Sequence, residues 1–263
     1  MEERKPHQFN KSLDRGLQVL DLFTRDIPSL SAKEIADRLG VGATTLYPFL
    51  HTLVLHGYLE VDANKRYRLG LKLLERVGEL NQVYDVRSVA RRELVKLSRL
   101  VAANARLAVL YGNEVLYLEQ EEGGPAANII LREVVGLRVP SYCTALGKVL
   151  LAYLPSEHLD PIIDSLVFVP LTDNTIACPE RLREELQAVR QRGYSTEIEE
   201  LQLGASCVGA PIRGSTGRVI AAISTSVLAS RAQGEELTRI IEAVQAAAAD
   251  ISAQLGFNGQ DPL

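Results

Sequence analysis

The sequence predicts an α+β protein of two domains, a small helical domain closed by a β-hairpin and a larger domain with a mainly antiparallel sheet. Three observations predict this architecture. The chain has 263 residues, enough for two domains of ordinary size. Apolar residues follow helical spacing up to Gly57, and a short hairpin pattern comes next. From Arg106 onward, hairpin patterns alternate with helical ones, which is typical of a sheet covered by helices.

The composition is that of a folded protein without membrane segments. Hydrophobic residues make up 46% of the chain and charged residues 24%, and no apolar run reaches the ~18 residues that a membrane helix needs. The N-terminal residues lack the apolar region of a secretory signal, so we expect a cytoplasmic protein with no membrane partner. The 3 cysteines and 4 histidines are too scattered for a disulfide framework or a metal site, and we expect no metal and no cofactor.

Charge is distributed unevenly along the chain. Residues 1–72 carry 11 Lys and Arg against 9 Asp and Glu, whereas residues 73–263 carry 18 against 24. The net charge of −4 therefore comes from the C-terminal part. A mildly basic end on an acidic body fits a protein that touches phosphate groups with one domain only.

Helical signals define the first two helices. A helix over Ser12–Thr24 is expected to pack on its neighbours through one apolar stripe, made of Leu13, Leu17, Leu20 and Phe23. Ser31 and Glu34 have the spacing of a capping box, which predicts that a second helix begins at Ala32. Gly40 is placed to end that helix as a left-handed C-cap.

A third helix and a hairpin follow directly. Apolar residues at helical spacing run from Leu46 to Val54. Tyr58–Val61 and Tyr67–Leu69 are typical of two strands around a polar turn. Two short helices joined by a glycine-containing turn and followed by a basic hairpin form a winged helix-turn-helix, whose second helix enters the major groove of DNA. The basic hairpin is then a wing that contacts phosphate or the minor groove.

Pro48 lies inside the third helix of this pattern. A proline in a helix removes a backbone hydrogen bond and its ring clashes with the preceding turn, at a cost of ~3 kcal/mol. The cost disappears if the helix begins at Thr45 with Thr44 or Thr45 as its N-cap, because first-turn amides have no intrahelical partner. We therefore expect a recognition helix that begins late or bends.

The runs SLDRGLQVLDLF, LSAKEIADRLGV, TTLYPFLHTLVLHGYLE and RYRLG resemble the DNA-binding domain of the IclR family of bacterial regulators. The family usually has a basic residue at the position of Pro48. The resemblance implies that the partner is a double-stranded DNA operator. It also implies DNA contacts from the first helix, the recognition helix and the wing, through Lys11, Arg15, Thr44, Thr45, Tyr47, His51, Lys65, Arg66 and Arg68.

The same patterns set the expected domain boundaries: a flexible tail at 1–9, the winged domain at 10–71, a linker helix at 72–87, the larger domain at 88–257 and a tail at 258–263. In the larger domain a hairpin turns at Gly112-Asn113, and ANIILREV is a further strand candidate. Helices are expected over SYCTALGKVLLAYL, DPIIDSL and ERLREELQAVRQRG. YSTEIEEL, two strands around GSTG and a final long helix complete the domain.

The runs VPSYCTALGKVLLAYL, RGYSTEIEELQLGASCVGAPIR and GRVIAAISTS resemble the effector-binding domain of the same family, a GAF-like fold. Together with the N-terminal runs, the resemblance covers residues 10–255 in family order. It implies a homodimer or homotetramer and a pocket for a small-molecule effector. The pocket residues that it implies are Leu131, Tyr142, Thr144, Ala145, Leu146, Glu197, Cys207, Ser224 and Ser226.

The residue types of this implied pocket indicate an acidic effector. Ser224 and Ser226 are two residues apart, so they share one face of a strand. Free amides at the start of the helix that begins near Thr144, together with these hydroxyls, suit a carboxylate. Glu197 favours a ligand hydroxyl or water, and Tyr142 with Leu131 would form an apolar wall. We expect a small organic or aromatic acid.

Two other functions fit parts of the sequence. A hydrolase would use the Ser, Cys and His present, but the chain has no GxSxG elbow. A Cys143–His158 pair would need a chance alignment in space. A ligand-binding signalling protein whose helix-turn-helix contacts protein is the other alternative, and the basic wing argues against it. The sequence therefore favours a sequence-specific DNA-binding transcriptional regulator, not an enzyme, whose operator binding responds to a small molecule.

Overall fold

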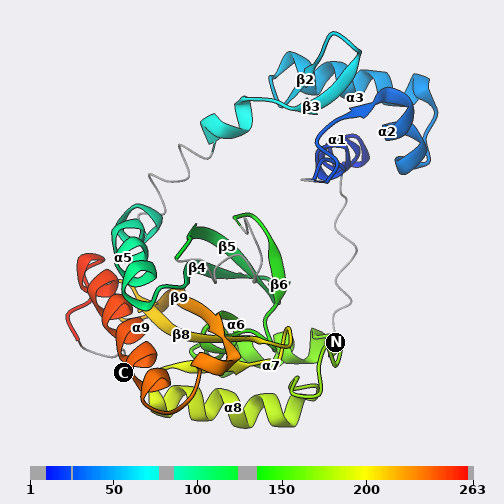
Figure 1. The fold of residues 1–263 in the computed structure, drawn as a ribbon. Helices are drawn as coiled ribbons and strands as arrows, with labels where there is room; N and C mark the ends of the chain where they lie inside the picture. The colour runs from blue at the N-terminus through cyan, green and yellow to red at the C-terminus, as the bar shows by residue number, and fades with distance from the viewer. Residues whose placement is uncertain (1–9, 25, 77–85, 124–134, 260–263) are drawn as a thin grey trace. The chain divides into compact units, whose positions relative to one another are not determined.

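The computed structural model describes residues 10–24, 26–76, 86–123 and 135–259. The chain divides into two compact units, one that ends at Val83 and one that begins at Tyr84 (Figure 1). The first is mainly helical, and the second contains a six-stranded sheet, so the predicted α+β class is confirmed. Among the helices of the described ranges, none is both long and apolar enough to cross a membrane.

The N-terminal unit is a three-helix domain closed by a small sheet. Its helices are α1 (Lys11–Asp21), α2 (Ala32–Leu39) and α3 (Ala43–Leu55), and its strands are β1 (Leu30–Ser31), β2 (Leu59–Val61) and β3 (Arg66–Leu69). The strands pair antiparallel in the order β1-β3-β2. Buried side chains from all three helices and the sheet form one core: Val19, Phe23, Leu30, Ile35, Ala36, Leu46, Leu50 and Leu59. The predicted helix-turn-helix and its wing are confirmed.

Both ends of α2 follow the predicted capping chemistry. The backbone N–H of Ser31 donates to Glu34 Oε2 at 2.7 Å, and the N–H of Glu34 donates to Ser31 Oγ at 3.3 Å. This reciprocal pair satisfies two amides that have no partner inside the helix. At the other end Gly40 adopts φ of 62°, the left-handed conformation that glycine reaches without a steric penalty.

Only the second half of the apolar stripe expected along α1, Leu20 and Phe23, lies in or against the core. Leu13 is 63% exposed and Leu17 is 53% exposed, whereas Val19 is completely buried. The helix turns a neighbouring face to α2 and α3, so that Val19 and Phe23, which are one turn apart, supply its core contacts. The expectation for Leu13 and Leu17 was therefore wrong, because helical spacing alone does not say which face meets the other helices.

The recognition helix α3 begins earlier than expected. Gly42 is its N-cap and Ala43 its first residue, so the expected late start at Thr45 was wrong. Pro48 is accommodated within the continuous helix, because the φ angle of proline suits a helix and only one backbone donor is lost. The lost donor would have bonded the carbonyl of Thr44 one turn earlier. The carbonyl of Pro48 accepts a hydrogen bond from Thr52 Oγ1 at 2.8 Å.

The C-terminal unit is built on one antiparallel sheet. Its strands, in the spatial order β6-β5-β4-β9-β8-β7, all pair antiparallel. Their bounds are β4 (Asn104–Tyr111), β5 (Glu114–Glu121), β6 (Arg138–Pro140), β7 (Ser195–Ile198), β8 (Ala205–Arg213) and β9 (Val219–Leu228). The two predicted hairpins are present as β4–β5 and β8–β9. The strand candidate ANIILREV lies outside the described residues.

Helices cover both faces of this sheet (Figure 1). Helices α5 (Val86–Val101) and α9 (Gly234–Gln254) pack on one face, and α6 (Ala145–Ala152), α7 (Ser156–Ser165) and α8 (Pro179–Arg192) lie on the other. Successive residues of β9 point to opposite faces, so Ile223 belongs to the α5–α9 core and Ala222 to the α6–α8 core. Of the expected linker helix at 72–87, residues 77–85 lie outside the described ranges.

Two glycines let the start of α6 lie directly on the sheet. A Cβ atom on Gly147 would be 2.1 Å from the carbonyl oxygen of Ser141, so this close approach excludes any other residue. A Cβ atom on Gly209 of β8 would be 3.1 Å from the carbonyl of Ala145. The N-terminus of α6 therefore forms one wall of any cavity on this face of the sheet.

Candidate functional site

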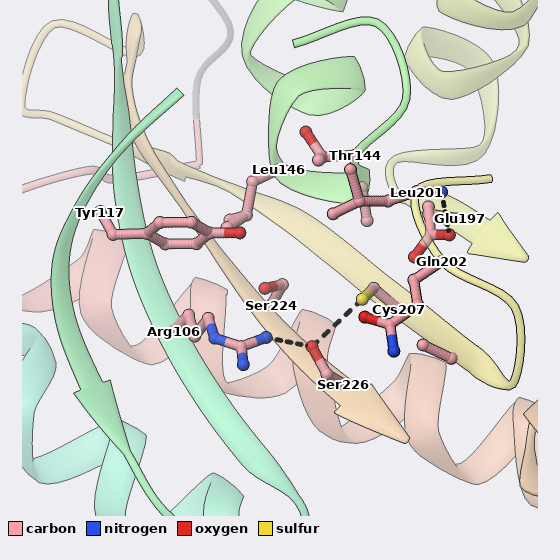
Figure 2. Close-up of a pocket in the computed structure, with 12 residues that line it drawn as sticks. Arg106, Tyr117, Thr144, Leu146, Glu197, Leu201, Gln202, Cys207, Ser224 and Ser226 are labelled. Carbon is pink, nitrogen blue, oxygen red and sulfur yellow. Dashed lines mark hydrogen bonds between the residues drawn. The ribbon is translucent and has the colours of Figure 1, made fainter. Parts of the chain in front are cut away.

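A small cavity lies between the first turn of α6 and the sheet (Figure 2). Its enclosed volume is about 30 Å³, which holds roughly one or two water molecules. Residues from β4, β5, β7, β8 and β9 meet the helix terminus around it. The lining consists of Arg106, Tyr117, Thr144, Ala145, Leu146, Glu197, Leu201, Gln202, Ala205, Cys207, Ser224 and Ser226.

The structure brings together most of the pocket residues that the sequence suggested, namely Thr144, Ala145, Leu146, Glu197, Cys207, Ser224 and Ser226. Tyr142 does not line this cavity. Its ring packs against Phe168 at 5.0 Å between centroids, and its hydroxyl donates to the carbonyl of Val169 at 3.0 Å. Tyr142 therefore does not form the expected apolar wall of the cavity, because its side chain packs in the core against the loop that contains Phe168 and Val169. Leu131 lies outside the described residues.

Sequence reasoning missed five lining residues, of which Arg106 matters most. The others are Tyr117, Leu201, Gln202 and Ala205. Arg106 is opposite Ser224 in the β4–β9 register and faces the same side of the sheet. A charged residue amid the apolar strand NARLAVLY is the signal that could have found it, because a buried arginine requires partners.

Arg106 is the cation of the cavity and is only 2% exposed. Its Nε donates to Gln120 Oε1 at 2.9 Å, and its Nη1 donates to Ser226 Oγ. The guanidinium carbon lies 5.8 Å from the centre of the Tyr117 ring, within the range of a cation–π contact. Burial raises the pKa of Tyr117 to about 12, against the opposing effect of Arg106, so this phenol stays protonated.

Glu197 supplies a carboxyl group on the other side of the cavity (Figure 2). It is 2% exposed, and its Oε1 accepts the backbone N–H groups of Glu200 at 2.7 Å and Leu201 at 3.2 Å. Burial raises the pKa of Glu197, although hydrogen bonds from Cys207 and these two amides oppose the increase. The carboxyl group is thus fixed in place by the backbone that follows β7.

Cys207 and Ser226 connect the two charged groups. Cys207 Sγ lies 3.1 Å from Ser226 Oγ, the atom to which Arg106 donates. Burial and the nearby Glu197 carboxyl both raise the pKa of the Cys207 thiol. A thiol that stays protonated is a poor nucleophile, so Cys207 acts here as a polar lining group.

The N-terminus of α6 adds backbone donors to the cavity. Thr144 is the N-cap, and its Oγ1 accepts the N–H of Gly147 at 3.2 Å. For the backbone amides of Ala145 and Leu146, no acceptor is found among the described residues. Amides at a helix start favour negatively charged or strongly accepting ligand atoms.

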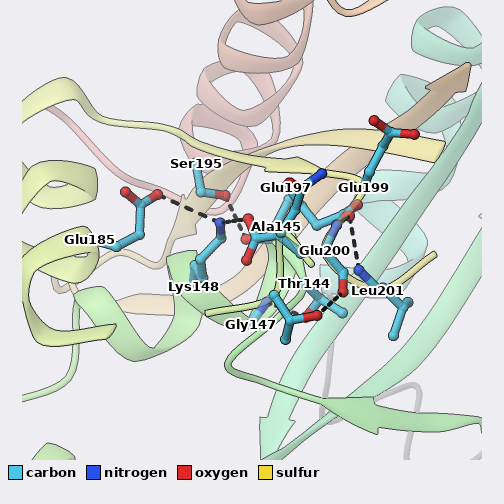
Figure 3. Close-up of polar contacts among 12 residues, drawn as sticks. Thr144, Ala145, Gly147, Lys148, Glu185, Ser195, Glu197, Glu199, Glu200 and Leu201 are labelled. Atoms are coloured by element: carbon cyan, nitrogen blue, oxygen red, sulfur yellow. Dashed lines mark hydrogen bonds and ion pairs between the residues drawn. The ribbon is translucent and has the colours of Figure 1, made fainter. Parts of the chain in front are cut away.

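A buried ion-pair cluster anchors the loop behind Glu197 (Figure 3). Lys148 Nζ lies 2.5 Å from Glu200 Oε1 and 3.7 Å from Glu185 Oε1. Glu185 in turn accepts a hydrogen bond from Arg192 at 2.6 Å, which connects the cluster to the end of α8. Because the N–H of Glu200 binds the Glu197 carboxylate, this cluster also fixes one edge of the cavity.

The N-terminal unit presents a different surface, along α3. Thr44, Tyr47 and His51 are all exposed, and their spacing places them on one face of the helix, with Thr45 beside them. The Tyr47 side chain is 54% exposed, although it is large and partly apolar. An exposed helix face carrying hydroxyl, phenol and imidazole groups has the donors and acceptors that reading base edges requires.

The wing residues differ in how firmly they are held. Arg66 donates from Nε to Ser29 Oγ at 3.0 Å and from Nη2 to the Ser29 carbonyl at 2.9 Å, and it also lies 3.3 Å from a Glu34 carboxylate oxygen. It therefore fixes the wing to the start of α2. Lys65 lies exposed at the turn of the wing, with φ of 58°, and the ion pairs of the described residues do not include it.

The other basic candidates are partly engaged within the unit. Arg68 pairs with Glu60 at 2.8 Å while remaining 61% exposed. Arg15 is half-buried and donates to the carbonyl of Leu39 at 3.3 Å, near the turn between α2 and α3. Lys11 is exposed at the start of α1. Exposure thus favours Lys65 and Lys11 for contacts outside the chain, and Arg15 and Arg66 hold the domain together.

Comparison with known families assigns both units. Residues 12–63 match the IclR helix-turn-helix domain, and residues 79–253 match the C-terminal domain of the bacterial transcriptional regulator IclR. The chain belongs to the IclR family. It is therefore a transcriptional regulator with a helix-turn-helix domain, as the resemblance implied.

Relatives match along almost the whole length of this IclR-family chain. The transcriptional regulator XynR of Escherichia coli is 37% identical over 94% of this chain and 98% of its own. KipR of Bacillus subtilis is 31% identical with the same coverage of each chain. An IclR homologue from Microbacterium hydrocarbonoxydans, crystallised with 4-hydroxybenzoate, is 28% identical with a TM-score of 0.84, over 93% of this chain and 98% of its own. The Thermotoga maritima IclR structure has a TM-score of 0.76 at 29% identity, over 94% of this chain and 99% of its own.

Proposed function

We propose that this IclR-family protein binds a double-stranded DNA operator through residues 10–71 and that a small-molecule effector in the cavity beneath α6 controls this binding. The observation that carries the proposal is the cavity itself. The buried guanidinium group of Arg106 and the buried carboxyl group of Glu197 lie on two sides of this cavity. The N-terminus of α6 lies above them, and its backbone amides can donate to a ligand. Such a set of polar groups in one buried place is expected of a ligand site.

The relatives support the same function. They are named transcriptional regulators, and one solved homologue holds 4-hydroxybenzoate. We take the effector of this chain to be a small organic or aromatic acid. The raised pKa of the Cys143 and Cys207 thiols argues against a cysteine nucleophile. The names of the relatives support a protein that acts by binding and not as an enzyme.

The proposed DNA contacts come from α3 and the wing. Thr44, Thr45, Tyr47 and His51 face the major groove, and Lys65 contacts the phosphate backbone. One winged helix covers too few base pairs for useful specificity, so the active form is a homodimer or homotetramer in which two winged helices bind two half-sites. Such a regulator acts in the cytoplasm, where its operator is.

A nuclease footprint on DNA upstream of the protein's own gene tests the DNA half of this proposal. The wild type should protect one region with two half-sites about one helical turn, or a multiple of it, apart. Tyr47→Ala should abolish protection, whereas the control Leu55→Ala, at an exposed position on the last turn of α3, should preserve it. Protection that survives Tyr47→Ala would refute the assignment of α3 as the recognition helix.

A further inference from the structure

We propose that α5 and α9 form a contact surface for a second copy of this chain, in which the basic side of each α5 lies on the acidic side of the other copy's α9. The inference rests on the proposed homo-oligomer, and it names the surface and the charges that join two copies. It does not involve the cavity beneath α6, because α5 and α9 cover the opposite face of the sheet.

The solvent-facing side of α5 is basic. Its exposed charged residues are the cations Arg91, Arg92, Lys96 and Arg99. Lys96 pairs with the buried carboxylate of Glu93, whereas the ion pairs within the described ranges include none of the three arginines. The guanidinium group of arginine binds a carboxylate through two parallel hydrogen bonds, so this side of α5 fits an acidic partner.

The solvent-facing side of α9 carries the opposite charge. Its exposed charged residues are one cation, Arg239, and the acids Glu235, Glu236, Glu242 and Asp250. Glu235 pairs with Arg239, and Glu236 pairs with Arg231. Among the residues that the structure describes, no ion pair includes Glu242 or Asp250. A second copy of the chain therefore supplies the acidic helix that the arginines of α5 fit.

The two helices lie side by side and run in opposite directions (Figure 1). Arg231, just before α9, donates to the carbonyl of Val101 at the end of α5 at 2.8 Å, and Gln254 at the end of α9 lies 3.5 Å from Glu93. A two-fold axis parallel to the helices therefore places each α5 over the α9 of the other copy. The same surface then forms both halves of the contact, as in a closed symmetric dimer.

An open groove of about 600 Å³ between the two helices fits this arrangement. Its apolar lining includes Leu100 and Val101 of α5 and Ile240 and Ala243 of α9. Leu100 is 75% exposed, although it is a large apolar residue. Because the end of α5 lies beside the start of α9, the two-fold axis brings Leu100 of each copy to the groove of the other. Burial of this apolar surface adds to the ion pairs, which alone contribute little when exposed.

The size of the surface determines the expected strength of the contact. At 1.5 Å per residue, the 16 residues of α5 and the 21 residues of α9 span roughly 24 Å and roughly 32 Å, and two helices are roughly 20 Å wide. Each copy therefore buries roughly 600 Å², which is near the lower limit of specific interfaces. We expect a reversible contact that high salt weakens, because salt screens exposed charges.

Sedimentation equilibrium of full-length protein with exchanged charges tests the surface. Arg92→Glu with Arg99→Glu makes α5 acidic, and Glu242→Arg with Asp250→Arg makes α9 basic. Each double variant alone brings like charges together, so its self-association should weaken about 10-fold or more and its mass should fall to half that of the wild type. An equimolar mixture of the two should recover the wild-type mass, because both contacts of the mixed pair then join opposite charges.

Exposed positions on the other face of the sheet provide the matched controls. Arg181→Glu and Glu184→Arg reverse charges on α8 and should leave the mass unchanged. Circular dichroism checks that each variant is folded, and recovery in the mixture also shows that neither double variant is misfolded.

The inference is overturned if both double variants keep the wild-type mass, or if their mixture stays as small as its components. If Arg92→Glu with Arg99→Glu instead reduced the salt dependence of operator affinity at unchanged mass, the basic side of α5 would bind DNA and not a second copy. A wild type that is a monomer at every concentration would refute the proposed homo-oligomer as well. An oligomer whose mass none of these variants changes refutes only this surface.

Discussion

Lys148 Nζ lies 2.5 Å from Glu200 Oε1 in the interior of the C-terminal unit, where Lys148 is 1% exposed. Glu200 Oε2 has no hydrogen-bond partner among the described residues, and burial raises the pKa of this carboxyl group against the opposing effect of Lys148. A buried charge without its partner lowers the free energy of unfolding, so the buried surroundings favour the paired state of Lys148 and Glu200. The same loop presents Glu197 to the cavity.

Replacing Lys148 should therefore destabilise the C-terminal unit strongly. Lys148→Met leaves Glu200 buried without a cation, and we expect the free energy of unfolding to fall by about 3–5 kcal/mol. The double variant Lys148→Met with Glu200→Leu should recover much of the loss, because no unpaired charge remains. Urea unfolding measures both. Arg239→Met, which removes the exposed partner of the exposed Glu235 carboxylate, is the control and should change stability by about 1 kcal/mol or less. If Lys148→Met and the control lowered the free energy of unfolding by similar amounts, burial of the Lys148–Glu200 pair would not be the cause.

The carboxyl group of Glu197 should make stability depend on pH. Its folded-state pKa is raised above the ordinary value of 4.5, so the folded protein binds this proton more tightly than the unfolded chain does. The resulting stabilisation is fully present below pH 4.5 and is lost as the pH rises through the folded-state pKa. Glu197→Gln cannot lose a proton, so its stability relative to wild type should increase from pH 4 to pH 8. Urea unfolding across this range checks the sign, with the exposed-site variant Glu114→Gln as control. A relative stability that decreased would show that the pKa of Glu197 is lowered.

The close contact at Gly147 predicts a steep cost for one methyl group. In Gly147→Ala, the Cβ atom would approach the carbonyl oxygen of Ser141 to 2.1 Å, so α6 must move away from the backbone before it. We expect a loss of about 1–3 kcal/mol or more, together with weaker effector binding. Gly16→Ala in α1 is the matched control, since its Cβ meets nothing within 4 Å and should stabilise by about 0.5–1 kcal/mol. Hydrogen exchange measures the stability of each unit and so reports on both variants. If Gly147→Ala left the stability of the C-terminal unit unchanged, α6 would not be held against the sheet.

Pro48 offers a test of how proline affects DNA recognition. Pro48→Ala restores the amide that can donate to the Thr44 carbonyl, and we expect the N-terminal unit to be about 1–3 kcal/mol more stable. Pro48→Arg should give a similar gain and add a phosphate contact, so its DNA affinity should depend more steeply on salt than that of Pro48→Ala. Fluorescence anisotropy at several salt concentrations measures the salt dependence of DNA affinity for both variants and so distinguishes the added phosphate contact from the gain in stability. If both variants lost operator affinity equally, proline itself would be required for the shape of α3.

Local chemistry explains which features the sequence predicted well. The capping box at Ser31 and Glu34, the C-cap at Gly40 and the common face of Ser224 and Ser226 all depend on residues close in the chain. Their geometry follows from helix and strand periods alone. The early start of α3 escaped prediction because Gly42 caps it through its backbone conformation and without a side-chain hydrogen bond.

The missed features depend on contacts between distant segments. Arg106 belongs to the cavity only because β4 pairs with β9, 120 residues away at Ser226. Tyr142 left the expected lining because the loop that contains Phe168 and Val169 packs on it. Leu13 is exposed because the orientation of α1 is decided by its partner helices. The periodicity of the apolar residues predicts the helices and strands, whereas the order of the strands in the sheet determines which side chains come into contact.

The most direct test of the account measures operator occupancy by the full-length protein in the presence of a panel of organic acids. Fluorescence anisotropy measures the affinity of the protein for the footprinted DNA. This affinity should change by about 5-fold to 150-fold when an acid that fits the cavity is added. Ser224→Leu, which fills the cavity, should keep the affinity for DNA and lose this response. We expect a response in the wild type alone. An equal response in Ser224→Leu would contradict control of DNA binding from the cavity beneath α6.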